Sequence, residues 1–183
     1  MQDTDWSVTA VALPGESHLF RMYETTDLAD AYAIRLPKNT ITDPELLTRF
    51  LFSHQSLWVE LLMRMRDALV ARFGIKTSEQ LQNSGGERIG IFKIYETGMH
   101  EIILGEDDIH LDFRLSVLLQ TKMVYAESAS ELILSTVVHC HNRLGRIYIT
   151  LIAPFHRMVV RSALHRAARI GWPTSSISSN GRN

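Results

Sequence analysis

The apolar positions change their spacing along the chain, from alternation to a helical repeat and back. Residues 30–36 alternate, with Tyr32, Ile34 and Leu36 on one side, and Pro37 closes this predicted strand. Asp43 can cap a helix that begins at Pro44. A second helix is predicted over 56–73, where apolar residues recur three and four apart.

Beyond a polar loop over 76–88 the period becomes two. Strands are predicted over 89–96 and 99–104 with a tight turn at 97–98, and then over 109–119 and 131–141, with a looser connection at 121–130. A long helix follows, from a cap at Asn142 to Gly171. Pro154 is expected to kink it. The stripe expected to face the sheet consists of Tyr148, Leu151, Ile152, Phe155, Val159 and Ala163.

This order of elements predicts an α+β domain in which a curved antiparallel sheet wraps around the last helix. About 28 residues of helix span roughly 40 Å, so only a curved sheet can follow it, and that curvature leaves space between the two layers. Residues 1–16 are expected to be loose, 17–171 to form one domain, and 172–183 to be a flexible tail.

Two stretches of the chain resemble a known family. The segments LGEDDIHLDFRLSV (104–117) and TVVHCHNRLGRIYITLIAPFHRMVV (136–160) are similar to a bacterial family called domain of unknown function 2867. The resemblance implies the helix-grip fold of the START/Bet v-like (SRPBCC) superfamily, with an apolar cavity between the sheet and the last helix. Some superfamily members bind lipids or aromatic molecules there, and others perform cyclisation, hydration or isomerisation.

Composition narrows the class of protein. The 183 residues contain no apolar run long enough for a membrane span, and the first ten residues lack the pattern of a signal peptide, so a cytoplasmic location is expected. The single cysteine, Cys140, excludes an internal disulfide. Without a glycine-rich phosphate loop, no nucleotide cofactor is expected.

The charges are unevenly distributed along the sequence. Residues 1–139 carry a net charge of −8, whereas residues 140–183 contain seven arginines and no acidic residue. Arg157, Arg161, His165 and Arg169 are four apart and form one stripe on the predicted helix. We interpret this stripe as a solvated helix face and expect no binding to nucleic acid, because the overall charge is close to zero.

Candidate catalytic residues alternate with apolar ones on two predicted strands. If 109–119 pairs with 131–141, then His110, Asp112 and Arg114 lie beside His139 and His141. In an enzyme, Asp112 would orient a histidine and Arg114 would hold an oxyanion. The alternatives are a solvent-exposed Asp112–Arg114 ion pair or a homodimer contact. Metal binding by His139 and His141 with a third ligand is a weaker alternative, and no metal is expected.

The apolar faces of the same elements suggest a binding site for a small hydrophobic molecule. Its predicted lining consists of Phe113, Leu115, Tyr148, Leu151 and Phe155, with the Tyr148 hydroxyl as the polar group. The sequence therefore leaves three functions open. These are a binding module for a small hydrophobic ligand, an enzyme of the cyclase, hydratase or isomerase type, and an interaction protein whose cavity is filled by its own side chains.

Overall fold

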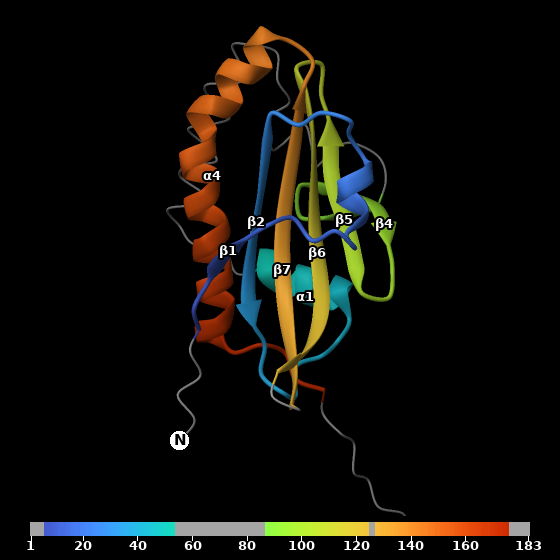
Figure 1. Cartoon of the computed structure of the whole chain (residues 1–183), viewed down its shortest axis with the longest axis vertical. Helices are drawn as coiled ribbons and strands as arrows, with labels where there is room; N and C mark the ends of the chain where they lie inside the picture. The colour runs from blue at the N-terminus through green and yellow to red at the C-terminus, as the bar shows by residue number, and fades with distance from the viewer. Residues whose placement is uncertain (1–5, 54–86, 125–126, 176–183) are drawn as a thin grey trace, which may run out of the picture.

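A seven-stranded antiparallel sheet and one long helix dominate the computed structural model, which describes residues 6–53, 87–124 and 127–175 (Figure 1). The elements in chain order are β1 (Thr9–Val11), the 3-10 turn η1 (His18–Arg21), β2 (Leu28–Arg35), α1 (Pro44–Ser53), β3 (Arg88–Ile89), β4 (Phe92–Thr97), β5 (Glu101–Asp107), β6 (Leu111–Val124), β7 (Glu127–Cys140) and α4 (Arg143–Ile170). The predicted α+β class with a curved sheet and a long last helix is confirmed, and it is consistent with a helix-grip fold.

The strand order in the sheet is β1-β2-β7-β6-β5-β4-β3. Strands β3 to β7 form a meander, and β2 joins it by pairing with β7. The two edges are very short, three residues in β1 and two in β3. The longest strands therefore lie in the middle of the sheet.

The predicted start of α1 and both predicted ends of α4 are confirmed. The Asp43 carboxylate accepts hydrogen bonds from the amides of Glu45 and Leu46 at 2.8 and 3.1 Å, so it caps α1. The Asn142 side chain caps α4 through the Gly145 amide at 3.0 Å, and Gly171 ends it with a φ of 97°. Pro154 lies inside α4. The second predicted helix, 56–73, lies outside the described residues.

Two of the boundaries predicted from the sequence are wrong. Residues 9–11 are not loose but form β1, which pairs with β2 from Thr9 opposite Ala33 to Val11 opposite Ala31. The looser connection predicted at 121–130 is a continuation of β6 and β7, whose pairing runs down to Val124 opposite Glu127.

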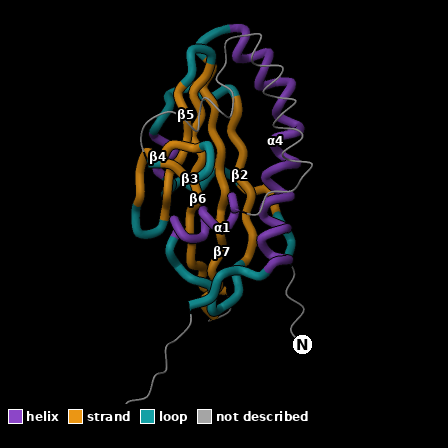
Figure 2. Tube along the Cα trace, turned by 180° about the vertical axis from the view of Figure 1, so that it is seen from behind, coloured by secondary structure: helices purple, strands orange, loops and turns teal. Residues whose placement is uncertain are grey.

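Both faces of the sheet are covered. Helices α1 and α4 lie against one face. Figure 2, the view from behind, shows α1 in front of the strands. The shared core contains Leu47, Leu104, Leu134 and Leu164. On the opposite face, Leu13, Leu19 and Met22 from the N-terminal segment pack against Ile103, Ile133 and Val137. The face that carries the predicted catalytic residues is therefore largely covered by the chain's own N-terminal segment.

Candidate functional site

The predicted hairpin forms and places four of the five polar candidates on one face of the sheet. Asp112 lies directly opposite His139, and the His141 Nε2 is 3.1 Å from an Asp112 oxygen. His110 is different, because it precedes β6 in a turn. Its Nδ1 lies 2.9 Å from the side-chain nitrogen of the helix cap Asn142. The His110 carbonyl accepts a hydrogen bond from the His141 amide at 2.9 Å, so His110 lies beside His141 as expected, but its side chain contacts Asn142.

Arg114 does not pair with Asp112, as the sequence suggested, but with Asp107 on β5 at 2.6 Å. Its guanidinium also lies 3.7 Å from the ring centre of Tyr95, whose hydroxyl donates to Asp107 at 2.8 Å. These contacts leave the Arg114 side chain 12% exposed, so the predicted solvent-exposed orientation is wrong. Gly105 permits this arrangement, because a Cβ there would lie 2.8 Å from the Arg114 Cδ.

The N-terminal segment completes this cluster. The Tyr23 ring stacks on His139 with centroids 5.6 Å apart, and His139 Nδ1 lies 3.0 Å from the carbonyl oxygen of Thr25. Burial raises the pKa of Tyr23 to about 12, so its hydroxyl stays protonated at neutral pH. The contacts of Arg114 and His139 hold β5, β6, β7 and the N-terminal segment together. A catalytic role for His110, Asp112, Arg114 and His139 stays a prediction.

The five predicted ligand-binding residues do not converge on one cavity. Leu115 is part of the core shared by α1, α4 and the sheet. Phe113 and Tyr148 are half-buried against a separate cluster that includes Leu111 and Ile149. Leu151 and Phe155 are exposed on the outer side of α4, so their predicted orientation toward the sheet is wrong. The residues of α4 that are buried instead are Gly145, Ile149, Val160, Leu164, Ala167 and Ala168.

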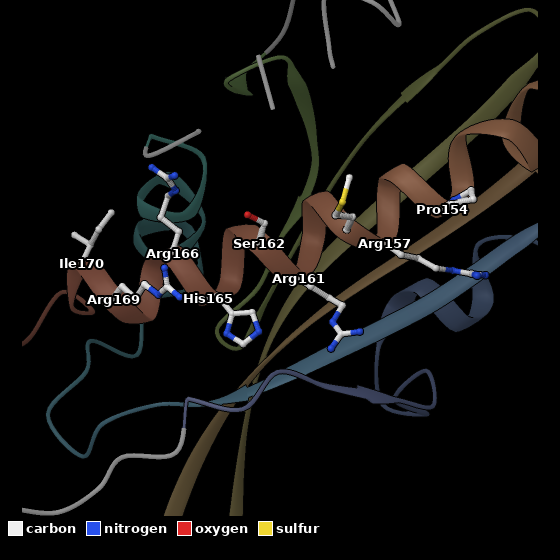
Figure 3. A pocket seen from close by; sticks show the side chains of 9 residues that line it. Pro154, Arg157, Arg161, Ser162, His165, Arg166, Arg169 and Ile170 are labelled. Carbon is white, nitrogen blue, oxygen red and sulfur yellow. The ribbon is translucent and has the colours of Figure 1, made fainter. Parts of the chain in front are cut away.

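A pocket of about 890 Å³ lies along the C-terminal part of α4. The described residues that line it all belong to this helix, and they are Pro154, Arg157, Met158, Arg161, Ser162, His165, Arg166, Arg169 and Ile170. We call this set the basic pocket. Figure 3 shows Arg157, Arg161 and His165 on one side of the helix and Ser162 and Arg166 on the other. The predicted arginine stripe is thus one wall of a pocket.

The electrostatics of the basic pocket favour an anion. Its described lining contains four arginines and one histidine but no acidic residue. Among the described residues, Arg161, Arg166 and Arg169 have no acidic side chain within ion-pair distance, whereas Arg157 lies 3.5 Å from Asp30. Guanidinium groups donate in a planar fork that suits carboxylates and phosphates. An anionic group in this pocket would therefore meet unpaired donors.

Asp30 was missed by the sequence reasoning. It lies on β2 and contacts both His156, at 3.3 Å, and Arg157, at 3.5 Å. These contacts cross from the sheet to α4 just after Pro154 and hold one end of the basic pocket in place. One signal was available, because Asp30 is the acidic residue that precedes the apolar alternation of Tyr32 and Ile34 on the same strand face.

Within residues 6–53, 87–124 and 127–175, no group of three or more His, Cys, Asp or Glu side chains is arranged to hold a metal ion. Among the same residues, no helix is both long and apolar enough to cross a membrane.

The fold and the basic pocket define an α+β protein with a cationic surface on its last helix. Comparison with family models identifies the family: residues 22–163 match the model described as protein of unknown function (DUF2867), and the chain belongs to this family. No curated protein and no solved structure matches the chain.

Proposed function

We propose that the protein is a binding module for a small amphipathic anion, an apolar molecule that carries a carboxylate or phosphate. The observation that carries this proposal is the composition of the basic pocket, in which Arg161, His165 and Arg169 of one helical stripe share the lining with Pro154, Met158 and Ile170. The arginines would bind the anionic group and the apolar side chains would contact the hydrocarbon part. This places the small hydrophobic ligand beside α4 rather than between α4 and the sheet.

The volume and the packing agree with this placement. A pocket of about 890 Å³ is within the usual range for a small-molecule site, about 300–1,000 Å³. The interface between α4 and the sheet is instead filled by side chains such as Leu115, Val160 and Leu164.

Binding of decanoate and of decanol, measured by isothermal titration calorimetry, tests the proposal. The two probes share one chain length and differ in charge. We expect decanoate to bind at least about tenfold more tightly, because hydrogen bonds to charged groups contribute roughly 1.5–3 kcal/mol. The double variant Arg161→Gln/Arg169→Gln should abolish this preference. Arg49→Gln is the matched control, because Arg49 is an exposed arginine on α1 that pairs with Glu45.

Two results would contradict the proposal. One is equal affinity for decanoate and decanol, and the other is an unchanged preference in the double variant. Native mass spectrometry of the purified protein provides an independent test, in which we expect any co-purifying small molecule to be an apolar acid.

A further inference from the structure

A row of large apolar side chains is exposed on the N-terminal half of α4. Ile147, Leu151, Phe155 and Met158 are 60%, 59%, 47% and 47% exposed. Their spacing of four, four and three residues places them along one line on the helix surface. We call these four residues the apolar row. Contiguous exposed apolar surface of this kind commonly marks an interaction site.

Cationic side chains lie at both ends of the apolar row. Arg143 and Arg146 precede it, and Arg157 and Arg161 follow Phe155. The whole of α4 contains six arginines and no acidic residue. Arg146 pairs with Asp27 at 3.1 Å and Arg157 with Asp30 at 3.5 Å. Among the described residues, Arg143 and Arg161 have no acidic side chain within ion-pair distance, so a partner of this helix meets the apolar row with positive charge near either end.

The shape of this surface restricts the partner. The apolar row lies on a single helix whose opposite side, with Ile149, Val160 and Leu164, is buried against the sheet (Figure 1). A convex helix with an apolar centre and arginine flanks has the character of helices that lie in a membrane interface. There the apolar side chains enter the acyl boundary and the arginines contact lipid phosphates.

We propose that the protein docks on the surface of an anionic membrane through the apolar row of α4. Charge complementarity supports this partner, because α4 contains six arginines and no acidic residue, and among the described residues Asp27 and Asp30 pair with only two of these arginines. Ile147, Leu151 and Phe155 do not line the basic pocket, whereas Met158 belongs to both, so the apolar row borders the proposed ligand site at one end.

Vesicle co-flotation of the full chain tests the proposal. We expect binding to phosphatidylglycerol vesicles that exceeds binding to phosphatidylcholine vesicles at least about tenfold and falls with added salt. The double variant Leu151→Asn/Phe155→Asn should lower binding to phosphatidylglycerol vesicles by at least about tenfold. Each asparagine removes an apolar side chain from the interface while leaving all arginines in place.

The chain provides a matched control for this variant. Leu46 and Phe20 are the same two residue types and are 51% and 62% exposed, but they lie on α1 and η1. Leu46→Asn/Phe20→Asn should leave vesicle binding unchanged. Circular dichroism should show that both double variants fold, and decanoate binding of the Leu151→Asn/Phe155→Asn protein should equal that of the parent.

Three outcomes would overturn the membrane proposal. The first is equal binding to phosphatidylglycerol and phosphatidylcholine vesicles. The second is an equal loss of vesicle binding in the control variant. The third is light scattering that shows a dimer which the Leu151→Asn/Phe155→Asn variant converts to a monomer, with no vesicle binding by the parent. That result would assign the apolar row to a second copy of the chain.

Discussion

Replacing Phe155 by alanine should lower the free energy of unfolding by only about 1 kcal/mol. Phe155 is 47% exposed, so folding removes about half of its side-chain surface from water. Complete burial of a phenylalanine side chain contributes roughly 1.5–3 kcal/mol, and the exposed half contributes nothing. Truncation on an open surface also leaves no enclosed cavity, which is the additional cost in a packed core.

Leu164 on the same helix is the comparison, because it is completely buried. Leu164→Ala should cost about 2–5 kcal/mol, since its site is closed on all sides. With a urea dependence of about 2 kcal/mol per molar, the unfolding midpoint should fall by roughly 0.5 M for Phe155→Ala and by about 1–2.5 M for Leu164→Ala. A loss of 3 kcal/mol or more in Phe155→Ala would refute the outward orientation of the apolar row.

Three further measurements test other parts of the structure. Glu101→Ala should lower the free energy of unfolding by about 2–4 kcal/mol and speed amide exchange in η1, because the Glu101 carboxylate accepts hydrogen bonds from the buried hydroxyls of Ser17 and Ser116. Unchanged amide exchange would contradict this prediction. Burial raises the pKa of Cys140 from 9.0 to about 11, which lowers the fraction of reactive thiolate at pH 8 roughly 100-fold. Native protein should therefore react with iodoacetamide roughly 100-fold more slowly than unfolded protein, and equal rates would show an accessible thiol. Burial alone would raise the pKa of Asp27, but hydrogen bonds from the Cys140 amide and Arg146 lower it from its ordinary value. Its stabilising contribution is therefore complete above about pH 5 and is lost as the pH falls through the lowered pKa. Asp27→Asn should flatten the loss of stability at acidic pH, and an unchanged pH profile would count against these contacts.

Most strands of the meander, the start of α1 and both ends of α4 could be predicted from the sequence, because local chemistry defines them. The predicted strand 89–96 is wrong, since a turn at Gly90, which has a φ of 62°, divides it into β3 and β4. Asp43 and Pro44 start α1, Asn142 starts α4, and Gly171 ends it. Alternation in β6 and β7 also placed Asp112 and His139 on the same face of the hairpin. In each case a residue's own conformational preference or its nearest neighbours decide the outcome.

The rotation of α4 could not be predicted, because apolar residues occur on more than one of its faces. The spacing of the large apolar side chains predicts that Leu151 and Phe155 belong to the buried stripe. The structure instead buries small residues, Gly145, Ala167 and Ala168, together with three aliphatic ones. At Gly145 an added Cβ would collide with the backbone of His110, so the absence of a side chain there allows the start of α4 to lie against the turn before β6.

The partners of the polar face were also beyond sequence reasoning. Tyr23 and His139 are more than a hundred residues apart, and nothing in the local pattern indicates that they stack. The same holds for Asp30 and His156, which meet between the sheet and α4. Contacts of this kind depend on the complete topology, which brings the N-terminal segment across the strands near the C-terminus.

The very short edges of the sheet have a consequence for the chain at high concentration. An edge strand displays unpaired amide and carbonyl groups that another molecule can use to extend the sheet into an aggregate. Here β1 and β3 present only three and two residues, whereas the 14-residue strands β6 and β7 are enclosed by neighbours along much of their length. Aggregation by strand addition would therefore require an edge to detach first, and β1 pairs with β2 along only three positions. Substitutions that loosen the first dozen residues would expose β2, a far longer strand, and should shorten the shelf life of the protein in solution.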